Sequence, residues 1–204
     1  MRGATAIALV LAFALAGCGH SKTTVAPAPA GWMRHHVDDG GFSIETPAAW
    51  RTAEKLDRKS LDKFFQRNPG VAPLKRALAG GLIKIVALDP DAAAGFTTNV
   101  NVLVHGLGGT MPLSKYASAN KKAVKRLTGT EPDVKLTRLP AGRCVQVSYE
   151  HAFNYPSGRK KLALLQYAFL RGASEYVVTF TTLPSLEERY RTTFARSARS
   201  FRFD

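Results

Sequence analysis

The chain has 204 residues and a formal net charge of +14 at pH 7, with 29 Lys and Arg against 15 Asp and Glu. Its two cysteines are too few for a framework of disulfide bonds. The length beyond residue 31 allows one domain with a substantial core and is too short for two well-packed domains.

The chain begins with a short apolar segment. Residues 4–16 are apolar or small except for Thr5, and Arg2 is the one charged residue before them. As a helix this segment would span about 20 Å, too little for a hydrocarbon core of about 30 Å. A segment of this kind is typical of a secretory signal. The residues that close it, Leu-Ala-Gly-Cys at 15–18, resemble the lipobox of bacterial lipoproteins.

This resemblance implies a location and an anchor. In lipoproteins the cysteine thiol receives a diacylglyceryl group and the chain is cut just before it, here between Gly17 and Cys18. Residues 1–17 would then be a signal peptide. The mature chain would be held at the extracytoplasmic face of the cell membrane, and two acyl chains on one residue make that attachment stable. The alternative is an ordinary cleaved signal with Cys18 as an incidental cysteine.

Residues 18–31 form the predicted tether. After Cys18 they are rich in Ala, Pro and Thr and have no apolar periodicity. Such a segment gives a root-mean-square reach of about 20 Å. The folded domain is therefore predicted to occupy residues 32–204.

The domain is predicted to open with a β-hairpin. Two strands, 33–37 and 42–45, flank an Asp-Asp-Gly-Gly turn at 38–41. Alternation of apolar and polar residues predicts that the second strand is half-buried. Pro47 ends it, and Trp50 is expected to anchor the core.

Helices and strands are expected to follow in mixed order. Apolar residues at helical spacing predict a helix at 60–67, with Ser60 as its cap. A second helical turn is expected at 72–79. Strands are then predicted at 82–88 and 96–105.

The C-terminal half is predicted to contain a helix, a meander and a second helix. The clearest helix spans 113–127, and the four strands of the meander span 134–139, 144–151, 161–171 and 175–182. The apolar run 162–170 predicts a central strand, and short connections predict antiparallel neighbours. Ser185 and Glu188 form a capping-box pattern that opens the last helix, and 201–203 is expected to be extended. The fold class is therefore predicted as α+β.

Parts of the domain resemble the PsbP-like fold, which includes bacterial lipoproteins of the LpqN type. The similar parts are the Phe-x-Ile-x-x-Pro-x-x-Trp opening at 42–50, the late meander at 162–182 and the Ser-Ala-Arg-Ser-Phe ending at 197–201. The resemblance implies an α/β/α sandwich with a central antiparallel sheet. It also implies a binding or assembly role, because members share no catalytic residues, so no site residue can be carried over.

Candidate catalytic and metal-binding patterns have simpler structural interpretations. His35, His36, Asp38 and Asp39 are close in sequence, but adjacent hairpin residues point to opposite faces. The His-Gly-Leu-Gly-Gly run at 105–109 is similar to an oxyanion-hole loop, yet the chain has no Gly-x-Ser-x-Gly elbow, and Ser157 lies in a turn pattern. Without an activating base nearby, Cys144 is expected to be a buried apolar residue. We expect no catalytic residue, metal ion or cofactor.

A contact surface is predicted on the helix at 113–127. Its cations Lys121, Lys122, Lys125 and Arg126 are close enough to form one positive patch. Removing residues 1–17 takes away one charged residue, Arg2, so the remainder carries +13. Anionic lipid, an acidic wall polymer or an acidic protein are the expected partners, and nucleic acid is not expected outside the cytoplasm. A simply solvated face is the alternative.

The sequence thus predicts a membrane-anchored, extracytoplasmic binding or assembly module without enzymatic activity. The alternative is a carrier for a small ligand or lipid, with a cleft between the sheet and the helices. Tyr149, Phe153 and Tyr155 are candidates to line such a cleft, although alternation with Val145 and Val147 favours a core position for Tyr149.

Overall fold

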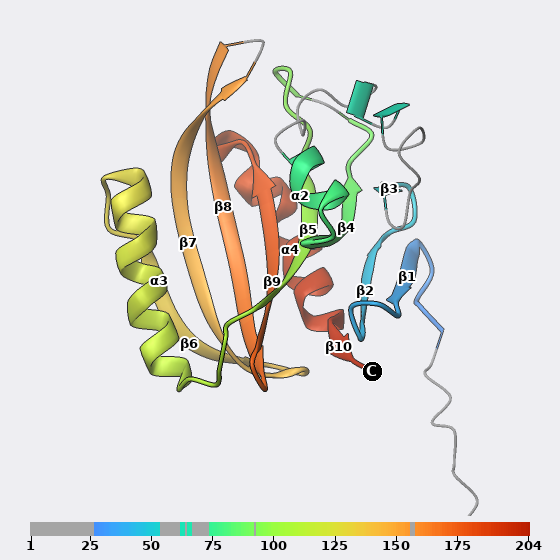
Figure 1. Cartoon of the computed structure of the whole chain (residues 1–204). Helices are drawn as coiled ribbons and strands as arrows, with labels where there is room; N and C mark the ends of the chain where they lie inside the picture. Colours follow the sequence, from blue (N-terminus) through green and yellow to red (C-terminus); the bar gives the residue numbers. More distant parts are fainter. Residues whose placement is uncertain (1–26, 54–61, 64, 67–73, 92, 156–157) are drawn as a thin grey trace, which may run out of the picture.

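The computed structural model describes residues 27–53, 62–63, 65–66, 74–91, 93–155 and 158–204. Its main element is an antiparallel sheet with the strand order β3-β4-β5-β9-β8-β7-β6 (Figure 1). Its strands are β3 (Arg51–Ala53), β4 (Ile83–Leu88), β5 (Asn99–Gly106), β6 (Asp133–Leu139), β7 (Gly142–Tyr155), β8 (Gly158–Arg171) and β9 (Ser174–Thr182). A smaller sheet has the order β1-β2-β10, from β1 (Trp32–Val37), β2 (Phe42–Pro47) and β10 (Arg202–Phe203).

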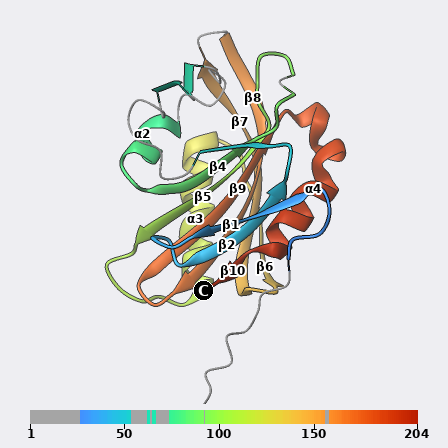
Figure 2. The same ribbon diagram turned by 90° about the vertical axis from the view of Figure 1, so that its right-hand side faces the viewer.

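Helices and the small sheet cover both faces of the large sheet, as Figures 1 and 2 show together. The helices named here are α2 (Lys75–Ala79), α3 (Leu113–Thr128) and α4 (Glu187–Ser200), the last preceded by the 3-10 turn η2 (Pro184–Leu186). On the α3 face, α3 packs on Val145 and Ala168 while α2 packs on Val86. On the α4 face, α4 and the small sheet bury the largest core cluster. This is the α/β/α sandwich with a central antiparallel sheet, as predicted.

The meander at the C-terminal half forms as predicted, with β8 inside the sheet between β9 and β7. β7 and β8 are both longer than their patterns indicate, because Tyr155 still pairs with Gly158 at the end of the ladder. The pairing of β5 with β9 joins segments far apart in sequence, from Asn99 opposite Thr181 to Gly106 opposite Ser174.

Strand β2 differs from the sequence prediction. It was expected to be half-buried, but Phe42, Ile44, Ser43 and Glu45 are all buried. The reason is tertiary: β2 lies between β1 and β10, and the backbone N–H of Glu45 donates to the Ser200 hydroxyl at 2.8 Å. Alternation in the sequence therefore does not mark a solvent-facing side here.

Helix α3 matches its predicted span to within one residue and ends at Gly129, whose φ of +75° is the left-handed conformation that favours glycine. The predicted helix at 60–67 falls partly outside the described residues, and Ser60 is among those outside. Asp62, Lys63, Phe65 and Gln66 are helical. Among the helices that the structure describes, none is long and apolar enough to cross a membrane.

Candidate ligand-binding pocket

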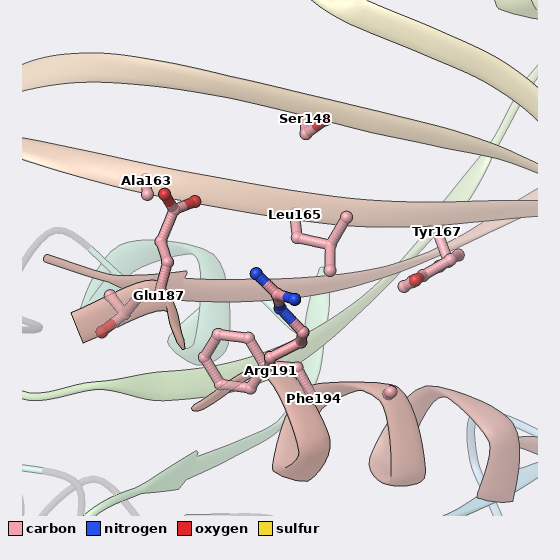
Figure 3. A pocket seen from close by; sticks show the side chains of 9 residues that line it. Ser148, Ala163, Leu165, Tyr167, Glu187, Arg191 and Phe194 are labelled. Carbon is pink, nitrogen blue, oxygen red and sulfur yellow. The ribbon is translucent and has the colours of Figure 1, made fainter. Parts of the chain in front are cut away.

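A pocket of about 290 Å³ lies between α4 and the α4 face of β7 and β8 (Figure 3). This volume is at the lower end of the range for small-molecule sites, so the pocket suits a small ligand. Its lining residues are Ser148, Ala163, Leu165, Tyr167, Thr182, Glu187, Arg191, Phe194 and Ala195.

The pocket is apolar inside and charged at its mouth. Ala163 and Phe194 are buried and Leu165 is half-buried, whereas Glu187 and Arg191 are exposed. Figure 3 shows the two charged side chains extending from the helix toward the strands. They are four residues apart and so lie on the same side of α4. The arrangement is chemically suited to an amphipathic molecule with its polar end at the mouth.

Two hydroxyl groups on the strands add hydrogen-bonding capacity. Ser148 on β7 and Tyr167 on β8 line the pocket, and within the described part of the chain neither hydroxyl has a hydrogen-bond partner. Burial raises the pKa of Tyr167, and the neighbouring Cys144 thiol adds to that effect. The phenol is therefore neutral at physiological pH and can donate or accept a hydrogen bond.

The two charges at the mouth differ in their ion pairing. The guanidinium of Arg191 forms an ion pair with Glu188, the residue that follows Glu187 in the chain. Glu187 itself has no ion-pair partner among the residues that the structure describes. Because Arg191 and Glu188 are both strongly exposed, this pair is screened by water and contributes little to stability. Arg191 can therefore turn toward a ligand at small cost.

Aromatic packing holds the helical wall of the pocket in place. Phe194 lies 4.8 Å from Phe180 between ring centroids and 5.6 Å from Tyr190. Thr182, which also lines the pocket, has its hydroxyl 2.9 Å from that of Thr98. This hydrogen bond ties the pocket to the segment before β5. The wall is therefore preorganised rather than formed by the ligand.

The predicted capping box at the start of this helix is wrong. α4 begins at Glu187, and its N-cap residue is Leu186, with no side-chain hydrogen bond to the helix end. Ser185 instead lies inside η2, where Pro184 starts a 3-10 turn. This turn shifts the helix start by one residue, so Ser185 and Glu188 no longer hold the capping positions. The two acids in the first turn, Glu187 and Glu188, still complement the helix dipole.

The structure divides the predicted basic patch on α3 into two sides. All four cations are exposed, but Lys121 and Lys125 each lie 2.8 Å from one carboxylate, that of Glu131. Hydrogen bonds from both ammonium groups lower the pKa of Glu131 to about 2. Lys122 and Arg126 have no such partner in the described chain and lie about 100° further around the helix. One half of the patch is thus compensated by an acid.

Several predicted residues have structural roles. Cys144 is fully buried and free, as predicted, and burial raises the pKa of its thiol to about 11. His35 is buried and His36 exposed, so the two point to opposite faces as expected. Within the described residues, no group of three or more His, Cys, Asp or Glu is arranged to hold a metal ion. The run at 105–109 connects β5 to α3.

Other predicted residues lie away from the pocket. Tyr149, Phe153 and Tyr155 pack around Phe96 and Leu162 instead of lining the pocket. Gly17, Cys18 and Ser157 lie outside the described residues. The residues that do line the pocket were missed, since they come from β7, β8, β9 and α4 and share no sequence motif. The i, i+4 pair of Glu187 and Arg191 is the one local pattern that marks it.

Comparison with known proteins supports the fold. No protein-family model matches the chain, and neither does any curated protein sequence. The solution structure of cyanobacterial PsbP (CyanoP) from Synechocystis sp. PCC 6803 is similar with a TM-score of 0.52 and 12% identity, over 93% of this chain and 99% of that one. The crystal structure of LpqN, involved in cell envelope biogenesis of Mycobacterium tuberculosis, has a TM-score of 0.51 and 12% identity, over 84% of this chain and 90% of that one. The chain therefore has the PsbP-like fold.

Proposed function

We propose that this protein is a lipid-anchored, extracytoplasmic binding protein that holds a small amphipathic molecule in the pocket beneath α4. The observation that carries the proposal is the pocket itself: an apolar interior, a charged mouth and two hydroxyls that have no hydrogen-bond partner among the described residues. A molecule with one polar end and a short apolar part would match these three features.

The role proposed is binding without catalysis. The pocket contains a serine and a tyrosine but neither histidine nor cysteine among its lining residues. A serine nucleophile needs an adjacent base to become reactive, and Cys144 is a neutral buried thiol. Compared with a protein-assembly module, the carrier alternative gains support from this concave site.

The membrane anchor rests on the lipobox at 15–18. LpqN, which shares the fold, is described as involved in cell envelope biogenesis, a location compatible with this anchor. Metabolic labelling with a radioactive fatty acid, followed by membrane fractionation, tests the anchor. Label and membrane association should both disappear in Cys18→Ala and persist in Cys144→Ala. Membrane association that survives Cys18→Ala would contradict lipid anchoring.

The ligand proposal is tested with three amphiphiles of equal chain length: decanoate, decanol and decylamine. Binding is followed by native mass spectrometry and calorimetry, and the comparison of the three reveals the preferred head group. Ala195→Trp should abolish binding by filling the pocket from α4. The matched control is Arg189→Ala, because Arg189 is an exposed arginine of the same helix that faces Asp91 at 3.7 Å instead.

The carrier function and the assembly function predict different outcomes of this experiment. Binding that is lost in Ala195→Trp and kept in Arg189→Ala supports the carrier function. The carrier function would be refuted if the purified protein bound none of the three probes and carried no copurified small molecule. A stoichiometric protein partner recovered with the lipidated chain would then favour the assembly module.

A further inference from the structure

Two arginines face each other at the end of the β6–β7 hairpin. Arg138 and Arg143 are direct register partners, and both are exposed. Side chains at such positions are about 5 Å apart at Cβ, where two like charges destabilise the sheet. In the described part of the chain neither guanidinium has a hydrogen bond or an acidic partner. An unrelieved repulsion at a fixed position is a feature that an anion would relieve.

Two more arginines belong to the same end of the domain. Arg171 is the last residue of β8, and its two terminal nitrogens are each 3.4 Å from the backbone oxygen of Asp204. Arg202 of β10 donates to the backbone oxygen of Arg199 at 2.6 Å. The carbonyl partners of Arg202 carry no net charge and do not neutralise it, whereas Arg171 lies beside an acidic residue, Asp204. We refer to Arg138, Arg143, Arg171 and Arg202 together as the arginine end.

The arginine end coincides with the entry of the tether. Figures 1 and 2 show the β6–β7 turn, the β8–β9 turn and the C-terminus at the lower end of the domain, and the first described residues, 27–31, lie toward that end too. Asp39, in the β1–β2 turn, is not a partner of these arginines, because its carboxylate lies 3.3 Å from the ammonium group of Lys84. An anchor at Cys18 would therefore hold this end of the domain nearest the membrane.

We propose that the arginine end docks on anionic lipid headgroups of the membrane that holds the anchor. A basic group near an anionic surface attracts it, and the attraction falls off within a Debye length. An anchor at Cys18, as proposed above, would keep the domain at that surface, so weak contacts of the arginines would add to the attachment. A guanidinium group can bind a phosphate through two parallel hydrogen bonds. The facing side chains of Arg138 and Arg143 offer two such groups at one place. Docking here is separate from ligand binding in the α4 pocket and places that pocket on the side of the domain.

Vesicle binding by the unlipidated chain tests this inference. The chain from residue 18 on, with Cys18→Ser, is mixed with vesicles of phosphatidylcholine, with or without phosphatidylglycerol, at low salt. Binding should require phosphatidylglycerol and should weaken about fivefold for each arginine removed. The double variant Arg138→Gln/Arg143→Gln should therefore bind about 25-fold more weakly.

The matched control is Lys122→Gln/Arg126→Gln, which removes the same charge from the outer side of α3. It should retain binding within about twofold, because charges more than about 10 Å from the surface are screened. Thermal unfolding checks the fold: the arginine double variant should be as stable as the parent or more stable, since its repulsion is gone.

Three results would overturn the inference. The parent chain could fail to bind phosphatidylglycerol vesicles at low salt. Both double variants could weaken binding equally, which would show that total charge and not the arginine end is responsible. Inorganic phosphate could bind at the arginine pair as tightly as the vesicles do, which would identify a soluble anion as the ligand. None of these results affects amphiphile binding in the pocket, so the two proposals fail independently.

Discussion

The phenol of Tyr190 on α4 donates a hydrogen bond to the carboxylate of Asp89, with 2.5 Å between the two oxygens. Both residues are buried, and the second carboxylate oxygen of Asp89 accepts from the backbone N–H of Asp91 at 2.9 Å. Burial raises the pKa of Tyr190 and the hydrogen bond to Asp89 raises it further, so the phenol stays protonated. This bond ties α4, and with it one wall of the pocket, to the segment that follows β4.

Replacing Tyr190 with phenylalanine should lower the free energy of unfolding by about 1–3 kcal/mol, because a buried carboxylate oxygen loses its donor. Urea unfolding measures the change. Tyr149→Phe is the matched control, since Tyr149 is partly buried but has no hydroxyl partner in the described chain, and it should change stability little. Equal losses in the two variants would show that the Asp89 bond contributes nothing specific.

Ser197 fastens the end of α4 to the small sheet. It is buried, and its hydroxyl donates to the backbone oxygen of Glu45 in β2. Ser197→Ala leaves that carbonyl without its partner and should cost about 1 kcal/mol of stability. Ser114→Ala, at an exposed position of α3, serves as the control and should be nearly neutral. If Ser197→Ala is as stable as the parent, the hydrogen bond from Ser197 to Glu45 does not contribute to the stability of the fold.

Stability should fall in mildly acidic solution because of His35. Burial lowers the pKa of His35 from its ordinary value of 6.5, and the ring nitrogen Nε2 lies 2.9 Å from the Thr46 hydroxyl. Below pH 6.5 the unfolded chain therefore binds this proton more readily than the native chain. The free energy of unfolding should decline as the pH drops through 6.5, with a slope of at most about 1.4 kcal/mol per pH unit.

The measurement is urea unfolding at several pH values between neutrality and about 5, above the range where carboxylates titrate. His35→Gln should flatten the slope, whereas His36→Gln should leave it unchanged because His36 is exposed. A slope that survives His35→Gln would assign the acid sensitivity to another group.

Cys144 should resist thiol reagents in the native protein. It is fully buried, and burial raises the pKa of its thiol to about 11, so little thiolate exists at neutral pH. In the Cys18→Ser chain, reaction with iodoacetamide should proceed only after denaturation. Rapid labelling of the native chain would instead mean that the core around β7 opens readily.

Local patterns in the sequence were sufficient for most elements of the fold. Alternation predicts β1, β2 and the four strands of the meander, and the apolar stripe at 113–127 predicts α3, because each pattern reflects the period of its own backbone. The Leu-Ala-Gly-Cys pattern at 15–18, which resembles a lipobox, is likewise a local signal. These features depend on neighbours within a few residues, so they are visible without the fold.

Contacts between distant segments were decided by the tertiary structure alone. Burial of Ser43 on β2 depends on strand β10, and that of Glu45 depends on Ser200 of α4, both more than 150 residues further along the chain. The pocket depends on the distance at which α4 packs over β7 and β8, and the arginine pair depends on the register of β6 with β7. Long-range packing sets which faces are covered, while local periodicity sets only which side chains share a face. For that reason the sequence predicts the strands of this protein, and the assembled sandwich creates its pocket and places its arginine end.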